Sequence, residues 1–186
     1  MCAAERRYTA DDLADMPDDG NRYEVIDGVL YVTPAPVLSH QWVQARLIAV
    51  LPAYVQAIGL MLFVAPTAVR ASEITEVQPD LLIFDPARVD PDEERRLPMS
   101  SLVLAVEILS PSTRHRDRGL KRRTYLANGV AEYWVVDAKR RSVDVWQAGA
   151  ETPDVRVDTL TWQPVVGHAP LVINLGEIFT RVFDRR

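Results

Sequence analysis

Two carboxylates stand in apolar stretches that otherwise have the composition of buried strands. Asp80 lies in "VQPDLLIFDP" and Glu107 in "LVLAVEILSPST". An isolated carboxylate in a buried strand costs on the order of several kcal/mol unless it is paired, hydrogen-bonded or bound to a metal. If the two strands pair side by side, both carboxylates reach one end of the sheet. Their oxygens would then suit a hard divalent cation such as Mg²⁺, which commonly binds one or two carboxylates together with water and phosphate oxygens.

The backbone carbonyl of Ile108, next to Glu107, would supply a further oxygen to such an ion. A bound cation would offset the buried charge and activate water for attack on phosphorus. Strand-end carboxylates also pair with arginines or accept backbone N–H bonds, so a structural role is the alternative for either residue alone. Two of them together, each in a run free of other charges, favour a metal site.

A basic stretch, "RHRDRGLKRR", follows the Glu107 strand directly. It predicts a helix over 117–128, on which Lys121 can lean over the strand end that carries Glu107. Its ammonium group would position the attacking water and offset charge on the phosphate. On this helix we expect one stripe to pack on the sheet: Leu120, Thr124 and Ala127.

The arginines of the same stretch are candidates for contacts with the phosphate backbone of a nucleic acid. The alternative for a basic helix face is simple solvation by water, but its position directly after the Glu107 strand favours a site. These candidates are Arg114, Arg116, Arg118, Arg122 and Arg123.

Glu24 and His40 are two further candidates. Glu24, in "YEVIDG", would be an additional metal ligand if its strand reaches the same cleft, and a salt bridge is the alternative. His40, in "SHQW", would carry a proton or contact a phosphate, and a plain surface position is the alternative. The histidines show no ligand spacing typical of zinc, and the motifs of P-loop, dinucleotide-binding and serine-hydrolase sites are missing.

The elements that must position these residues follow from apolar periodicity and turn signals, and they predict a mixed α/β fold with helices packed on a mixed sheet. Helices are expected over 9–17, from Ser39 to about Gly59 with a kink at Pro52, over 117–128, and near the C-terminal end. Strands are expected over 22–26 and 29–33, joined at Asp27–Gly28, and over 60–72, 77–86, 101–109 and 132–149, the last as a hairpin, with one more near 171.

Composition is that of an ordinary globular protein. The 186 residues favour a single domain over 1–186, with a helix in 1–19, a core over 20–180 and a tail over 181–186. The net charge of −5 disfavours a general nucleic-acid binder, but the cluster at 114–123 reverses that charge locally. A single cysteine, Cys2, and the lack of a signal or membrane segment indicate a cytoplasmic protein.

Several motifs, taken in order, resemble the Uma2 family, also called DUF820, of restriction-endonuclease-like bacterial proteins. They are "YEVIDGVLYVTPAP", "SHQ", "VQPDLLIF", "VEILSPST" and "RDRGLKRRTYLANGVAEYWVVD", within roughly residues 20–180. The resemblance implies the PD-(D/E)XK nuclease fold, a central mixed sheet flanked by helices, and a Mg²⁺-dependent phosphodiesterase site in which Mn²⁺ can substitute.

Residue by residue, the resemblance places the two acids of the nuclease motif at Asp80 and Glu107. The lysine that usually follows the second acid is replaced by Leu109, and the family resemblance implies a lysine moved to the next helix, which corresponds to Lys121. Glu24 matches the family's glutamate in "YE" as an additional acid.

These observations favour a Mg²⁺-dependent endonuclease that hydrolyses DNA, with a homodimer expected because duplex cleavage suits a two-fold assembly. A catalytically silent nuclease-fold module that binds nucleic acid or protein is the main alternative. Hydrolysis of a small phosphoester at the same site is a third reading.

Overall fold

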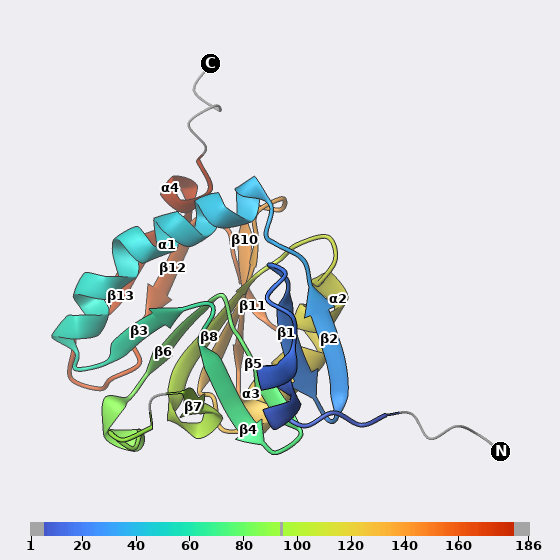
Figure 1. Cartoon of the computed structure of the whole chain (residues 1–186). Helices are drawn as coiled ribbons and strands as arrows, with labels where there is room; N and C mark the ends of the chain where they lie inside the picture. The colour runs from blue at the N-terminus through green and yellow to red at the C-terminus, as the bar shows by residue number, and fades with distance from the viewer. Residues whose placement is uncertain (1–5, 94, 181–186) are drawn as a thin grey trace.

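The structure, a computed structural model, describes residues 6–93 and 95–180. Its centre is a six-stranded mixed sheet with the strand order β11-β10-β9-β8-β6-β3 (Figure 1). Neighbouring strands are antiparallel except β8 and β9, which run parallel. The strands are β3 (Met61–Val64), β6 (Leu81–Phe84), β8 (Leu102–Ile108), β9 (Glu132–Asp137), β10 (Ser142–Gln147) and β11 (Asp154–Arg156).

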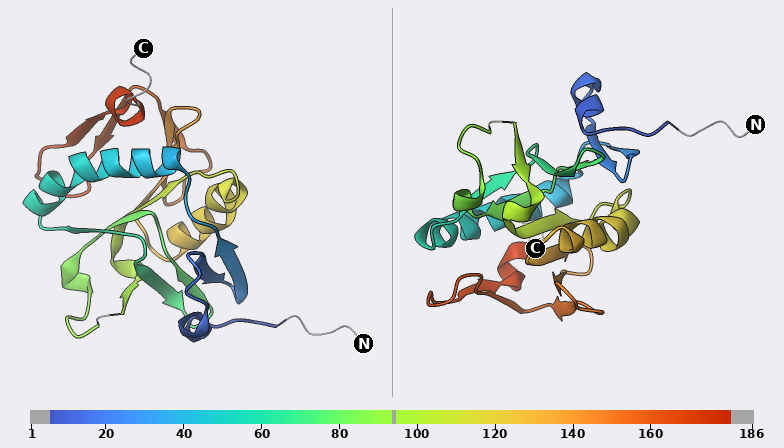
Figure 2. Two further views of the ribbon diagram at one scale, coloured as in Figure 1. Left: turned by 45° about the horizontal axis from the view of Figure 1, so that its top comes forward. Right: turned by 90° about the horizontal axis from the view of Figure 1, so that it is seen from below.

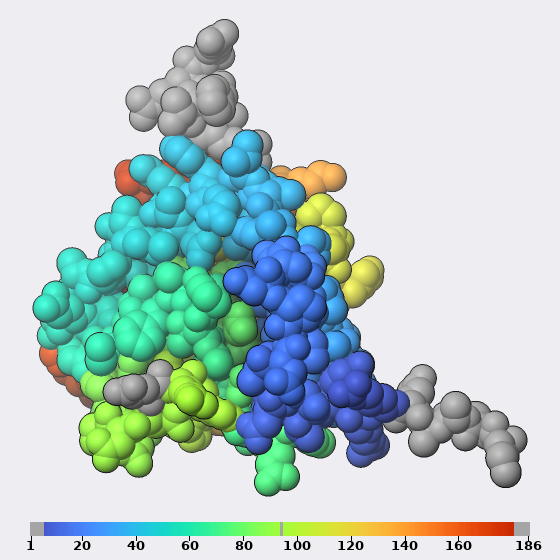
Figure 3. Space-filling model, viewed as in Figure 1, coloured from blue at the N-terminus to red at the C-terminus, as the bar shows by residue number. Residues whose placement is uncertain are grey.

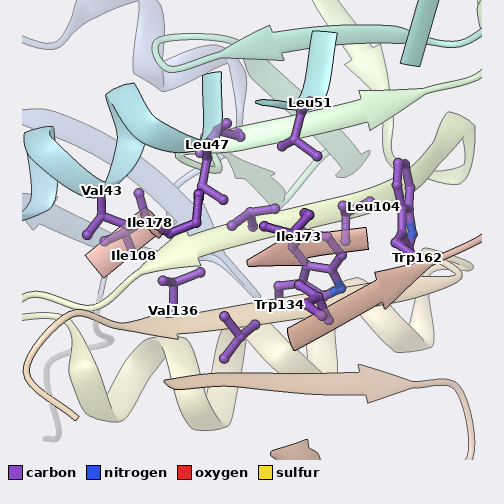
Figure 4. Packing of buried hydrophobic residues seen from close by; sticks show 14 of the residues in the cluster. Val43, Leu47, Leu51, Leu104, Ile108, Trp134, Val136, Trp162, Ile173 and Ile178 are labelled. Carbon is purple, nitrogen blue, oxygen red and sulfur yellow. The ribbon is translucent and has the colours of Figure 1, made fainter. Parts of the chain in front are cut away.

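One face of this sheet, the α1 face, is covered by α1 (Leu38–Ala57), α4 (Leu175–Phe179) and the hairpin of β12 (Thr159–Trp162) and β13 (Leu171–Asn174). Figure 4 shows side chains from these elements meeting those of β8 and β9. Because strand side chains alternate between faces, this core takes every second residue of the central strands. Its members include Leu47, Leu51, Leu81, Ile83, Leu104, Val106, Ile108, Trp134, Val136, Trp162, Ile173 and Ile178.

The opposite face, the crossover face, is covered by a second sheet and by the helical connection between β8 and β9. The second sheet has the order β2-β1-β5-β4-β7. Seen from below, the β1–β2 hairpin (blue) and the β12–β13 hairpin (orange to red) lie on opposite sides of the molecule (Figure 2, right). The strands are β1 (Arg22–Ile26), β2 (Val29–Thr33), β4 (Ala68–Ser72), β5 (Thr75–Val77) and β7 (Arg96–Pro98).

The connection between β8 and β9 is one continuous helical segment, here called the crossover helix, 114–127. It consists of α2 (Arg114–Arg116), a π-helical turn, η4 (Asp117–Lys121), and α3 (Arg122–Ala127). Gly129, with φ of 88°, follows its end in the left-handed conformation typical of a helix stop.

The stripe of the crossover helix that faces the sheet differs from the expected one. Asp117, Lys121 and Tyr125 are buried, whereas Leu120 and Thr124 are half-buried and Ala127 is exposed. The wider π turn keeps residues spaced by four in line along one side. The prediction of an apolar stripe over 120–127 is therefore wrong, because the sheet beneath carries buried acids that require polar partners.

Several local predictions are confirmed. Asp27 and Gly28, with φ of 53° and 82°, form the predicted tight turn between β1 and β2. Pro52 lies inside α1.

Other local predictions are wrong. The prediction of a helix over 9–17 is wrong in type and length: the segment forms only a short 3₁₀ turn, η1 (Asp11–Asp15), with Ala10 at the cap position, and Thr9 exchanges hydrogen bonds with Asp12. The single strand expected over 60–72 is two strands, β3 and β4, which belong to different sheets. Ser39 does not cap α1, because the helix starts one residue earlier with Val37 at the cap position and no side-chain cap. Between β6 and β8 the described chain forms a short 3₁₀ turn, η2 (Pro86–Arg88), then β7 and a second turn, η3 (Met99–Ser101). The tail over 181–186 and Cys2 lie outside the described residues.

None of the helices in the described part of the chain has the length and hydropathy that crossing a membrane requires.

The packing of α1 on the central sheet can be tested at two neighbouring positions. Leu47 is 1% exposed and Ile48 is 38% exposed. Leu47→Ala should lower the free energy of unfolding by about 2–5 kcal/mol, because it removes buried methyl groups and leaves a cavity. Ile48→Ala, the matched control, should change it by about 0.5 kcal/mol or less. Urea unfolding measures both, and equal losses would contradict the proposed orientation of α1.

Candidate functional site

A cavity of about 210 Å³ opens at the end of the central sheet where β8 finishes and β6 begins. We call it the acidic cavity. The segment 34–37, which connects β2 to α1, forms part of its wall, and Figure 3 shows α1 (cyan) adjoining the N-terminal hairpin (blue) on this side. Its polar lining comprises Arg22, Glu24, Thr33, His40, Asp80, Glu107, Ser110, Ser112, Thr113, Arg116, Asp117 and Lys121.

Strand register brings Asp80 and Glu107 to this cavity. Leu81 pairs with Val106 across the antiparallel β6–β8 ladder, so the next position along places Asp80 opposite Glu107. Residues directly opposite each other on antiparallel strands point to the same face. Both carboxylates therefore lie on the crossover face of the sheet, and both are buried.

Asp80 is held by three protein donors. Its Oδ1 accepts from Arg22 at 2.9 Å, and its Oδ2 accepts from His40 Nε2 and from the backbone N–H of Ile108, each at 2.8 Å. Burial alone would raise the pKa of Asp80, but the hydrogen bond and charge of His40 and the charge of Arg22 lower it to about 2. Asp80 is therefore a carboxylate at neutral pH.

Lys121 joins the two other acids of the cavity. Its Nζ lies 2.6 Å from Glu107 Oε1 and 2.7 Å from Glu24 Oε1. Burial opposes a charged lysine, but the charges of Glu107 and Glu24 raise the pKa of Lys121 above its ordinary value. Burial likewise opposes a charged Glu24, and Lys121 lowers the pKa of that carboxyl. Lys121 and Glu24 thus form a buried ion pair between the crossover helix and β1.

The pKa of Glu107 is raised, whereas that of Glu24 is lowered. Burial raises the pKa of Glu107 to about 8; Lys121 acts against this rise, and the charges of Asp80, Asp117 and Glu24 add to it. Tyr125 OH also donates to Glu107 Oε1 at 2.9 Å. Within the described residues no hydrogen bond or ion pair reaches Glu107 Oε2. With a pKa near 8, Glu107 is largely protonated at neutral pH when no cation is bound.

The donor set fits a hard divalent cation. Glu107 Oε2 has no protein partner in the described structure, and Asp80 Oδ1 accepts one bond and keeps a second lone pair. Glu24 Oε2 is buried without a hydrogen bond, with Arg116 at 3.7 Å. The N–H and C=O of one strand residue point the same way, so the carbonyl of Ile108 faces the Asp80 side. Among 6–93 and 95–180, no three His, Cys, Asp or Glu side chains form a metal cluster by themselves, so water or substrate oxygens would complete the set.

The structure separates the arginines of 114–123. Arg116 lines the acidic cavity, donates to Thr33 Oγ1 and lies 5.1 Å from the Tyr31 ring centroid. Arg114 lines a neighbouring cavity, and Arg123 is exposed. The remaining two contact β9 and β10: Arg118 lies 3.2 Å from both Asp137 and Asp144, and Arg122 lies 4.2 Å from the Trp146 ring centroid.

Sequence reasoning did not identify Arg22, Asp117 and Tyr125 as members of the site. A signal existed for Arg22, because it stands two residues before Glu24 and strand residues with that spacing share a face. Asp117 and Tyr125 are spaced by four on either side of Lys121, but that signal requires knowing that this face is the buried one.

The raised pKa of Glu107 predicts how stability depends on pH in the absence of divalent cations. A carboxyl whose pKa is near 8 in the folded state and 4.5 when unfolded contributes stability at low pH that is lost as pH rises between these values. The loss is about 1.4 kcal/mol per pH unit. Glu107→Gln should remove this contribution, so the free energy of unfolding of the variant should rise relative to that of the wild type as the pH increases from 6 to 8. Urea unfolding in EDTA measures the difference, and parallel pH profiles would contradict it.

Comparison with known proteins agrees with this architecture. The matching family model is Uma2, described as "Putative restriction endonuclease", and it covers residues 10–172. A crystal structure from Anabaena variabilis ATCC 29413, described as that of "a putative nuclease belonging to DUF820", has a TM-score of 0.77 and 18% identity over 92% of this chain and 97% of that one. At this identity the likeness shows a shared fold. A comparison with curated proteins gave no match. Because the family model spans most of its length, the chain belongs to the Uma2 family and has its restriction-endonuclease-like fold.

Proposed function

We propose that the protein is a metal-dependent endonuclease that hydrolyses DNA phosphodiester bonds at the acidic cavity. The observation that carries this proposal is the meeting of Asp80 and Glu107, opposite each other at a strand end, with Lys121 Nζ 2.6 Å from Glu107. Membership of the Uma2 family supports the reaction class. Mg²⁺ is the proposed ion, and Mn²⁺ is expected to substitute for it.

The residues that would hold the ion are Asp80, Glu107 and the carbonyl of Ile108, with Glu24 as an additional acid. When bound, a divalent cation polarises phosphoryl oxygens and favours deprotonation of water. The positive charge would also lower the pKa of Glu107, which the other acids raise. Glu107 would then be a carboxylate at neutral pH.

Lys121 is proposed to orient the attacking water and stabilise charge on the phosphate. An ammonium group has three N–H donors, and Glu24 and Glu107 accept two of them. The cavity is lined by Lys121, so its remaining donor can serve a water or phosphate oxygen there. Because its pKa is raised, Lys121 acts as a fixed positive charge and not as a proton donor.

His40 and Arg22 are proposed to position the first acid. Each binds a different oxygen of Asp80, so the carboxylate plane is fixed before substrate arrives. The guanidinium of Arg116, which lines the acidic cavity 3.7 Å from Glu24, is proposed to contact a substrate phosphate. The homodimer suggested by duplex cleavage stays a prediction.

One observation favours the alternative of a silent binding module. Arg22 and His40 already neutralise and hydrogen-bond Asp80, and Lys121 already pairs with Glu24. These contacts would hold the two acids without any ion. Cleavage assays decide between the two functions.

Glu107→Gln should abolish metal-dependent cleavage while preserving the fold, because a glutamine resembles the protonated side chain in size and hydrogen bonding. We expect nicking of plasmid DNA in Mg²⁺ to fall by more than the roughly 10–100-fold typical of losing an outer-shell partner. Glu76→Gln is the matched control, since Glu76 is also a buried strand carboxylate with a raised pKa but lies beside Arg96 in the second sheet. It should cleave like the wild type. Undiminished cleavage by Glu107→Gln would reject the site.

Lys121 is tested by separating its charge from its structural role. Lys121→Gln alone leaves two buried acids without their cation and should cost about 3–5 kcal/mol of stability. Combining it with Glu24→Gln removes one of those acids and should restore most of the stability, measured by urea unfolding. The double variant should still lose cleavage by about 100-fold or more relative to Glu24→Gln alone, the variant that shows what this acid contributes. A stable double variant that cleaves normally would show that Lys121 has only a structural role.

A further inference from the structure

A second cavity, of about 450 Å³, adjoins the acidic cavity. Val37 and Pro111 line both, so they form the shared wall between them. We call it the basic cavity, because three cationic side chains line it: Arg114 from the crossover helix, and Lys139 and Arg141 from the β9–β10 turn. Residues far apart in the sequence thus converge beside the proposed reaction site.

The cations of the basic cavity are not paired with acids in the part of the chain that the structure describes. Within the described residues, Arg114, Lys139 and Arg141 take part in no ion pair. The single acid that lines the cavity, Asp137, is already engaged: its Oδ1 accepts from the backbone N–H groups of Lys139 and Arg140, and its Oδ2 lies 3.2 Å from Arg118. The cavity therefore carries net positive charge, although the chain as a whole has a net charge of −5.

The start of α1 adds to this positive field. Val37 and Ser39 line the basic cavity, and this 20-residue helix has no side-chain cap at its first turn. An uncapped helix start presents N–H donors and the positive end of the helix dipole, which favour bound anions. This feature is independent of the three side chains and points to the same class of ligand.

Arg141 is also placed at a conformational cost. Its φ is 56°, in the left-handed region that non-glycine residues adopt with about 1–2 kcal/mol of strain. Glycine or asparagine is the usual residue at such a turn position. An arginine stands here instead, and it lines the basic cavity.

We propose that the basic cavity binds a backbone phosphate of the DNA substrate, adjacent to the phosphodiester that enters the acidic cavity. This inference rests on the proposed function and specifies the path of the strand: it passes over Val37 and Pro111, from the carboxylates to the arginines. A phosphate suits the site, since guanidinium groups and helix N–H donors are its preferred protein partners.

The test is the salt dependence of DNA binding in EDTA, where cleavage does not interfere. A short fluorescent duplex and its single strand are titrated by anisotropy at several salt concentrations. In the triple variant Arg114→Gln, Lys139→Gln and Arg141→Gln, the slope of log K against log salt should fall by about 0.9 for each lost contact with duplex, or about 0.7 with single strand.

A control variant removes the same number of charges elsewhere. Arg7→Gln, Arg95→Gln and Arg140→Gln change exposed arginines that line neither cavity, and Arg140 lies in the same turn as Lys139 and Arg141. Its slope should equal that of the wild type. Equal changes in both triple variants, an unchanged slope in the first, or no binding by the wild type would overturn the inference.

Cleavage in Mg²⁺, measured in parallel, separates this inference from the proposed function. If the slopes differ as expected but no protein cleaves DNA, the basic cavity binds phosphate and the nuclease proposal fails. If the wild type cleaves and the first triple variant keeps its salt slope, the nuclease proposal stands and the phosphate site is refuted. Circular dichroism and thermal unfolding confirm that the variants are folded.

Discussion

The buried contact of Lys121 with Glu24 and Glu107 is the constraint on which the site depends. All three groups are almost fully buried, and an unpaired charge at such a position would be strongly destabilising. Lys121 can meet both acids only if the crossover helix lies over the end of β8 and β1 lies beside it. Lys121 and Tyr125 engage only Oε1 of Glu107, so within the described residues its Oε2 stays available to the proposed cation.

Pairs between a buried acid of the central sheet and a cation of the crossover helix recur along the crossover face. Asp80, Glu107, Asp137 and Asp144 all point from the central sheet toward this face, while the intervening residues pack against α1. On the crossover helix, Lys121 pairs with Glu107, and Arg118 pairs with Asp137 and Asp144. Arg118 therefore fixes the helix on the sheet, whereas Arg114 and Arg116 remain beside the two cavities.

The sequence allowed the β1–β2 turn and the mixed α/β class to be predicted, because each depends on local apolar pattern or turn chemistry. The pairing of β6 with β8 could only be assumed, because it joins segments that are distant in the sequence. The sequence also identified Asp80 and Glu107 as site candidates, because they lie in apolar strands, and Lys121, because it lies on the helix that follows. The sheet-facing stripe of the crossover helix could not be predicted, because the π turn changes the helical spacing. Arg22 was missed since its role arises from a contact with Asp80, 58 positions away.

The distribution of the three charges between layers has a consequence for how the chain folds. Glu24 belongs to the second sheet, Glu107 to the central sheet, and Lys121 to the helix that bridges them. Burying either acid before the two sheets dock would leave a carboxyl without its lysine partner, at a large cost in free energy. A chain with only one sheet formed would therefore keep Glu24 or Glu107 in contact with water. The two sheets are therefore expected to fold cooperatively, and the contact that couples them lies at the proposed ion site.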